Sequence, residues 1–150
     1  MRIVVGCDHA GFTIKDAVVE AIKSEGHEVL DVGTYSKDRV DFPDFAEKAG
    51  NAIIQGEAER GVVICGSGIG VNISLNKMKG IYASLVMDSY SAHQGVEHDD
   101  MNVMCLGGMI IGPELAKELV RSFVNAKHID LDRYNNRINK FKAIENKFFK

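Results

Sequence analysis

The chain has 150 residues, the usual length of one compact domain, with 45% hydrophobic and 26% charged residues. A formal net charge of −3 supplies no basic field for nucleic acid or for an anionic membrane surface. No apolar run approaches the roughly 20 residues that cross a bilayer. Three widely separated cysteines indicate neither a disulfide framework nor a thiolate zinc site. We therefore expect one cytoplasmic domain over residues 1–150 that binds neither nucleic acid nor membrane.

Short apolar runs alternate with segments of helical periodicity along the chain. We predict buried strands at residues 2–6, 28–32, 61–65, 81–86 and 102–106. Helices are predicted at about 12–25, 44–56 and 113–125, and a polar, helical stretch joins the last two strands. Strands that alternate with helices over short connections predict an α/β fold, in which helices cover both faces of a parallel sheet.

A last helix, over about 133–148, breaks this alternation. It carries an apolar stripe with lysines and glutamates between its members, which are Ile138, Phe141, Ile144 and Phe148. The stripe either folds back on the parent sheet or lies on another subunit. We favour the second, because the predicted sheet already has enough helices to cover both faces.

The loop after the third strand is a candidate ligand site, because ligands of open parallel sheets bind beyond the carboxyl ends of the strands. It reads Cys65-Gly66-Ser67-Gly68-Ile69-Gly70. Its glycines let successive N–H groups point into one concavity, which attracts anions. The spacing matches neither a dinucleotide fingerprint nor a Walker loop. The alternative is a glycine-rich turn that binds nothing.

Cys65 ends this strand directly before the anion-favouring loop. Backbone dipoles at such a place favour the thiolate, which would make Cys65 a base or a nucleophile. The alternative is a small buried hydrophobe. We give that interpretation to Cys7 and Cys105, which no such loop follows.

Two further groups of polar side chains are weaker candidates. Asp8 and His9, after the first strand, could bind hydroxyls or phosphate, or Asp8 could simply cap the following helix. His98 is flanked by acids that could hold it protonated or fix its tautomer, although a solvated charged turn would have the same sequence. These acids are Glu97, Asp99 and Asp100.

Arg133 and Arg137 are four residues apart and therefore on one helical face, where they could jointly bind a phosphate. The alternative is two solvated surface arginines. The sequence contains no H-x-x-H pair, no carboxylate triad and no other metal-ligand spacing. We therefore predict neither a metal nor a cofactor.

Four motifs occur in order along the chain, and they are Gly6-Cys7-Asp8-His9-Ala10-Gly11, Val40-Asp41-Phe42-Pro43-Asp44-Phe45, Cys65-Gly66-Ser67-Gly68-Ile69-Gly70 and His98-Asp99-Asp100-Met101-Asn102-Val103. With Gly107-Gly108 and the Arg133/Arg137 pair, they resemble the ribose-5-phosphate isomerase B family. That family includes the subunits of galactose-6-phosphate isomerase. The resemblance covers essentially the whole chain.

The resemblance implies a Rossmann-like three-layer sandwich with a five-stranded parallel sheet. It also implies a homodimer, sometimes a tetramer, with an active site built by both subunits. The implied reaction is the metal-free conversion of D-ribose 5-phosphate to D-ribulose 5-phosphate through a cis-enediolate, a step of the non-oxidative pentose phosphate pathway. The implied catalytic residues are Cys65, Ser67 and His98, and the implied substrate-binding residues are Asp8, His9, Gly66, Gly68, Ile69, Gly70, Asp99, Arg133 and Arg137.

The resemblance also assigns roles. Cys65 would move the proton between C2 and C1, while the N–H groups of residues 66–70 hold the enediolate and Ser67 handles substrate oxygens. His98 would open the furanose ring. Asp8 and His9 would bind the sugar and its phosphate end, and Arg133 and Arg137 would take the phosphate.

The chain departs from the family pattern at four positions. Met109 stands where an arginine is usual, Phe42 where tyrosine is frequent, Asp99 where asparagine is frequent and Tyr134 where histidine is common. These departures leave open another phosphosugar substrate, such as allose 6-phosphate or galactose 6-phosphate. A non-catalytic sugar-phosphate-binding module is the third hypothesis, and the thiol of Cys65 argues against it because a sensor needs no base.

Overall fold

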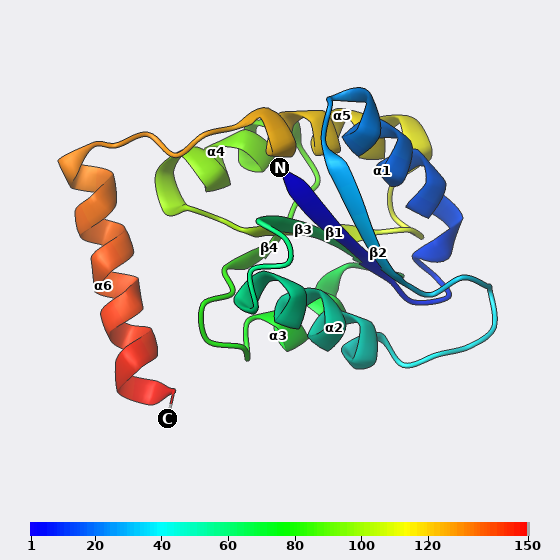
Figure 1. The fold of residues 1–150 in the computed structure, drawn as a ribbon, viewed down its shortest axis with the longest axis horizontal. Helices are drawn as coiled ribbons and strands as arrows, with labels where there is room; N and C mark the ends of the chain where they lie inside the picture. The colour runs from blue at the N-terminus through cyan, green and yellow to red at the C-terminus, as the bar shows by residue number, and fades with distance from the viewer. Residues whose placement is uncertain (150) are drawn as a thin grey trace.

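The computed structural model describes residues 1–149 and contains one five-stranded parallel sheet with helices on both faces (Figure 1). The strand order is β2-β1-β3-β5-β4. The strands are β1 (Arg2–Cys7), β2 (Glu28–Gly33), β3 (Arg60–Cys65), β4 (Ala83–Leu85) and β5 (Val103–Gly107). The helices are α1 (Phe12–Ser24), α2 (Phe42–Ile54), α3 (Ile69–Leu75), α4 (Ser89–Asp99), α5 (Pro113–Asn125) and α6 (Asp132–Phe148). The predicted α/β fold is confirmed.

Each strand presents alternate side chains to two separate cores. On one face, Ile3, Val5 and Ile64 pack against α1, α4 and α5. On the other face, Val4 and Val63 pack against α2 and α3. The strands at the centre of the sheet are buried on both faces, which explains why they consist almost entirely of apolar residues. Within residues 1–149, no helix has the length and apolar character needed to cross a membrane.

The edge strand β4 is shorter than predicted, with three residues in place of the six expected. Its pairing with β5 covers only Ala83–Leu85, and the side chain of Asn76 covers its free edge. The Asn76 amide donates to the Ala83 carbonyl at 2.8 Å and accepts from the Ala83 N–H at 3.0 Å. Asn76 thus satisfies the backbone of Ala83 on the side where a further strand would otherwise pair.

Helix α6 stands outside the three layers, beyond the end of the sheet where the strands begin (Figure 1). Ile138 is buried within this chain, and the ring of Phe141 lies 5.0 Å from that of Tyr82. Ile144 and Phe148 remain 60% and 68% exposed. The apolar stripe is therefore divided, because half of it packs against its own chain and half remains largely exposed.

The turn between β1 and α1 lies directly against β3. A methyl group on Gly11 would collide with the backbone carbonyl of Ile64. Only a glycine permits this approach, which holds the loop after β1 next to the loop after β3.

Gly11→Ala should therefore lower the free energy of unfolding by about 1–3 kcal/mol, the usual cost of overpacking a dense interior. The matched control is Gly112→Ala, where nothing lies within 4 Å of the added carbon. The control should change stability by less than about 0.5 kcal/mol. Urea unfolding of both variants tests this, and equal midpoints would contradict the close approach.

Candidate active site

Three loops meet at the carboxyl edge of the sheet. A side-chain carbon added to Gly66 would lie 3.3 Å from Met109 and 3.5 Å from Ala10, so the loops after β1, β3 and β5 are in contact. A side-chain carbon added to Gly107 would lie still closer, 2.8 Å from the backbone of Ser67. The ring of Phe42, at the start of α2, lies over Gly70. The predicted Cys65 loop is thus enclosed by its neighbours in the sheet.

Cys65 occupies the centre of this loop and is only 4% exposed. Its Sγ accepts a hydrogen bond from the Gly68 N–H at 3.2 Å. Gly68 has a φ of 81°, a left-handed conformation that glycine adopts without strain, and this conformation turns its N–H back towards the sulfur. A backbone N–H donor therefore points directly at the sulfur of Cys65.

Other N–H groups of the same loop are still free to bind a ligand. The N–H of Ile69 donates to Ser67 Oγ at 3.2 Å. The N–H groups of Ser67 and Gly70 have no acceptor within residues 1–149. Free backbone donors in a loop next to a thiol can stabilise an oxyanion that forms beside a base.

The other two cysteines fit the interpretation as small hydrophobes. Burial is the main cause that raises the pKa of the Cys7 thiol to about 11, in spite of the nearby Lys15 ammonium. Burial also raises the pKa of Cys105 well above its ordinary value, with a smaller contribution from Cys65. Both side chains are fully buried in the cores and stay protonated at neutral pH.

Asp8 acts on its own loop and does not cap α1, because its hydrogen bonds go to residues that precede the helix. Its Oδ1 accepts from the N–H groups of Ala10 and Gly11, both at 2.9 Å. The ring of His9 is oriented by the chain before α2, because its Nδ1 accepts from the Val40 N–H at 3.2 Å. This hydrogen bond places the proton of neutral His9 on Nε2, which can then donate to a ligand.

A buried lysine, which sequence reasoning missed, supports the segment that orients His9. The Nζ of Lys15 donates to the Thr34 carbonyl at 2.8 Å and pairs with the Asp31 carboxylate at 2.7 Å. It also lies 3.9 Å from the centre of the Tyr35 ring. Lys15 is 3% exposed, so these partners replace the water that its charge would otherwise bind. The pattern of α1 gave no signal, since a lysine there reads as a surface residue.

His98 lies in a second group of residues, at the end of α4. Its ring stacks on Tyr134 of α6 with centroids 4.1 Å apart, and its Nδ1 lies 3.0 Å from Gln94 Nε2. Arg133 and Arg137 follow on the exposed surface of the same helix α6, with Arg133 bonded to the Tyr134 hydroxyl at 3.2 Å.

Within residues 1–149, none of the flanking acids bonds directly to the His98 ring. Glu97 pairs with His93 at 3.0 Å, while Asp99 lies 3.5 Å from the amide of Gln94. Asp100 ends the helix in a left-handed conformation. The helical repeat explains this, because the residue that meets His98 is four positions away and not adjacent.

The two groups lie at opposite ends of the sheet. Cys65 is paired with Gly107, at the carboxyl end of β5, whereas α4 leads into Val103 at its amino end. Four residues of strand separate Val103 from Gly107, about 13 Å at the usual rise. Figure 1 shows α6 on the side where the strands begin. One chain therefore does not bring His98, Arg133 or Arg137 to its own Cys65.

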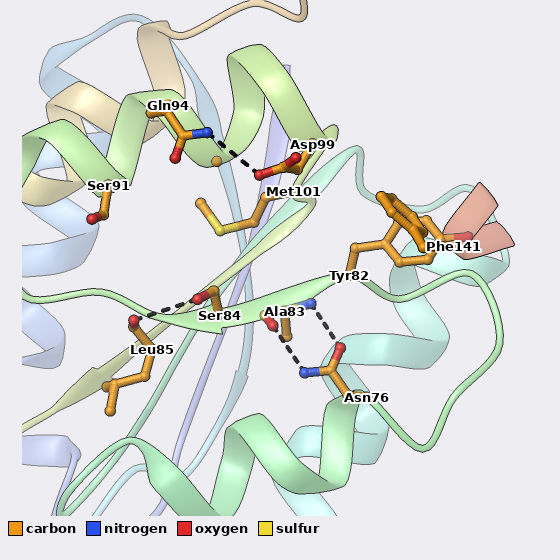
Figure 2. A pocket seen from close by; sticks show the side chains of 11 residues that line it. Asn76, Tyr82, Ala83, Ser84, Leu85, Ser91, Gln94, Asp99, Met101 and Phe141 are labelled. Carbon is orange, nitrogen blue, oxygen red and sulfur yellow. Dashed lines mark hydrogen bonds between the residues drawn. The ribbon is translucent and has the colours of Figure 1, made fainter. Parts of the chain in front are cut away.

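A pocket of about 460 Å³ opens beside the His98 group, between β4, α4 and α6 (Figure 2). Its lining includes Ser84, Gln94, Asp99 and Phe141, and no residue of the Cys65 loop. Within the described part of the chain, no three His, Cys, Asp or Glu side chains come together as metal ligands.

Comparison with known proteins assigns this arrangement to a class. The sequence profile of the Ribose/Galactose Isomerase family matches residues 3–141. Ribose-5-phosphate isomerase B of Escherichia coli (strain K12) is 38% identical over 144 residues, 96% of each chain. The galactose-6-phosphate isomerase subunit LacB of Clostridium acetobutylicum is 41% identical over 128 residues, 85% of this chain and 74% of that protein.

A solved structure agrees. Ribose-5-phosphate isomerase B of Clostridium thermocellum superposes with a TM-score of 0.93 at 38% identity, over 99% of both chains. The protein is therefore a Rossmann-like α/β protein of the sugar isomerase class. It belongs to the ribose/galactose isomerase family, as the motifs indicated.

The different settings of the three thiols predict selective alkylation. At pH 8, iodoacetamide should modify one thiol per chain, at Cys65, because the raised pKa values of Cys7 and Cys105 keep both protonated. Peptide mass spectrometry locates the modified residue, and Cys65→Ala is the control that should take up no label. Faster labelling of Cys7 or Cys105 than of Cys65 would contradict this description of the site.

Proposed function

We propose that this chain interconverts D-ribose 5-phosphate and D-ribulose 5-phosphate through a cis-enediolate. The observation that carries the proposal is the thiol of Cys65 beneath the Gly68 N–H, in a loop with two further free N–H donors. Membership of the ribose/galactose isomerase family supports the reaction class. The name of the Escherichia coli relative supports the five-carbon substrate.

The chemistry requires a base and an anion-binding loop side by side. A proton next to a carbonyl is weakly acidic, so its removal from C2 must be coupled to stabilisation of the oxygen that becomes negative. Cys65 takes the proton from C2 and returns it to C1, and the loop N–H groups bind the enediolate. Each critical N–H donor contributes about 3–4 kcal/mol, and a positioned general base about 10²–10⁴-fold in rate.

Ser67 and His98 act on the oxygens of the sugar. Ser67 Oγ stands at the edge of the loop and binds a substrate hydroxyl. The aldose rests mainly as a closed furanose, whose opening breaks the bond from C1 to the ring oxygen. The ring oxygen gains a proton and the C1 hydroxyl loses one. His98 supplies the proton to the ring oxygen and is restored by the proton that the C1 hydroxyl releases.

The phosphate binds at the far end of the substrate. Arg133 and Arg137 lie on one exposed face of α6, where both guanidinium groups can reach one phosphate. Asp99 and His9 contact hydroxyls, and Asp8 shapes the loop that carries His9. Binding of the phosphate holds C1 and C2 against Cys65, so remote binding energy lowers the barrier at the reacting carbons.

These roles require two chains, because Cys65 and His98 of one chain lie at opposite ends of its sheet. A two-fold homodimer can place the α4–α6 end of each chain against the Cys65 loop of the other, which completes two identical sites. Large apolar side chains exposed around that loop support a partner there. They are Ile69, Ile73, Met87, Tyr90, Met109 and Ile110.

The substrate panel tests the reaction. The purified chain should convert ribose 5-phosphate faster than allose 6-phosphate or galactose 6-phosphate, equally with and without EDTA. Cys65→Ala should lower the rate by about 10²-fold or more, because its methyl group cannot accept the C2 proton. Cys105→Ala is the matched control and should keep activity.

Three results would contradict the proposal. If the chain converts none of these phosphosugars, the hypothesis of a non-catalytic binding module replaces the proposal. A clear preference for a six-carbon substrate would instead support a function like that of the LacB relatives. Retention of more than about a tenth of the rate by Cys65→Ala would place the base elsewhere.

Subunit mixing tests the two-chain site. Cys65→Ala and Arg137→Ala chains should each be nearly inactive as homodimers. After exchange, a heterodimer contains one site with both residues intact, so random mixing should restore about a quarter of wild-type activity. Native mass spectrometry confirms the exchange. No recovery in exchanged heterodimers would mean that each chain builds its own site.

A further inference from the structure

Gln94 and His98 meet on one face of α4. They are one helical turn apart, and Gln94 Nε2 lies 3.0 Å from His98 Nδ1. The same Nε2 lies 3.5 Å from Asp99 Oδ2, the contact drawn as a dashed line in Figure 2. One amide group thus contacts an imidazole nitrogen and a carboxylate oxygen together.

The carboxylate determines which way the amide of Gln94 is turned. An ionised carboxylate only accepts hydrogen bonds, so the group that faces Asp99 is the NH2 and not the carbonyl oxygen. The NH2 is then also the group that faces His98. It can only donate, so Nδ1 must accept, and the single proton of a neutral imidazole sits on Nε2.

The other groups around His98 are compatible with this tautomer. From α6, the Tyr134 ring stacks on the imidazole and the Arg133 guanidinium lies 4.8 Å from the centre of the Tyr134 ring. From α4, Glu97 is engaged by His93 at 3.0 Å, and Asp100 ends the helix in a left-handed conformation. Within residues 1–149 no carboxylate bonds to the His98 ring, and such a carboxylate would favour a proton on Nδ1.

The second ring nitrogen of His98 is left for a ligand. Nε2 makes no hydrogen bond within the described chain. The buried side-chain atoms that lack a partner are His27 Nε2 and His128 Nδ1, so the unpartnered His98 Nε2 is not buried. An accessible Nε2–H donates to an oxygen atom of a ligand, whereas the opposite tautomer presents a lone pair there and cannot.

We propose that Gln94 is a positioning residue that holds neutral His98 in the Nε2–H tautomer, with Asp99 turning its amide. The meaning of this tautomer rests on the proposed function, in which Nε2–H is the donor that faces the ring oxygen of the closed aldose. Gln94 acts only through His98 and touches no substrate. Asp99 therefore has a role that asparagine, which is frequent at this position in the family, cannot perform in the same way. An asparagine amide both donates and accepts, so it can pair with either the NH2 or the carbonyl oxygen of Gln94.

The tautomer can be measured directly by NMR of the full-length chain. Nitrogen-15 spectra of the imidazole rings at pH 8.5, where an ordinary histidine is neutral, distinguish the two forms. His98→Asn assigns the His98 signals among the five histidines. We expect the Nε2–H form in the wild type. In Gln94→Glu we expect the Nδ1–H form, because the new carboxylate accepts from Nδ1. Glu97→Gln is the matched control on the same helix and should leave the His98 signals unchanged.

Initial rates supply the second measurement. Gln94→Glu should slow conversion of the cyclic aldose at least about tenfold, since a histidine in the wrong tautomer loses its function. The open-chain ketose, which needs no ring opening, should be affected less, and Glu97→Gln should affect neither direction. Gln94→Leu leaves Nδ1 without a donor and should give a mixture of both tautomers.

The two hypotheses can fail separately. A wild-type His98 in the Nδ1–H form, or a Gln94→Glu spectrum identical to wild type, overturns the role of Gln94 whether or not the chain is active. Absence of isomerase activity in a wild type that shows the Nε2–H form overturns the proposed reaction and leaves the role of Gln94 standing. If Gln94→Glu does not fold, the wild-type spectrum alone decides.

Discussion

The common direction of the five strands is the constraint on which the site depends. All carboxyl ends meet at one edge of the sheet, so the loops after β1, β3 and β5 come together without any long connection. The same rule sends the end of α4 and the start of α6 to the opposite edge. A base and its anion-binding loop can be completed on one chain. One chain cannot bring its own Cys65 together with a histidine that lies at the opposite edge of the sheet.

Glycine makes the carboxyl edge compact enough for chemistry. Gly11 lets the first loop press against β3, and Gly68 turns an N–H back onto the sulfur of Cys65. At each of these glycines, the backbone occupies space that a side chain would otherwise fill. Backbone N–H groups are donors that need little reorganisation when a negative charge forms. Around this centre, Asp8 and the Lys15–Asp31 pair hold loops in place. Rigid loop geometry, rather than a set of charged side chains, is what the chain supplies next to Cys65.

Much of the fold could be predicted because its signals are local. The central strands read as apolar runs, and Pro113 marks the start of α5 where the structure begins it. The length of β4 could not be predicted, since it depends on how far the strand pairs with β5. The division of the α6 stripe depends on Tyr82 and on Glu145, which accepts from the Gly80 N–H at 2.8 Å and from the Tyr82 hydroxyl at 2.9 Å.

In the candidate site too, contacts within one loop could be predicted from the sequence, and contacts between separate elements could not. Cys65 and its loop are contiguous in sequence, and their contact could be anticipated from the turn that glycines allow. The partners of His98 could not be anticipated from its neighbours. The acids beside it point elsewhere, and its contacts come from Gln94 one turn away and from Tyr134 on another helix. Lys15 was missed for a related reason, because a buried lysine becomes recognisable only with Asp31 and Thr34 in place.

The central claim is that two chains build one site, with the reacting carbons against Cys65 of one and the phosphate on α6 of the other. A crystal structure of the Cys65→Ala chain with a bound pentose phosphate tests this most directly. The account predicts the sugar carbons against the Gly66–Gly70 loop of one copy, and the phosphate against Arg133 and Arg137 of a second copy. A phosphosugar held entirely by residues of a single chain would contradict it.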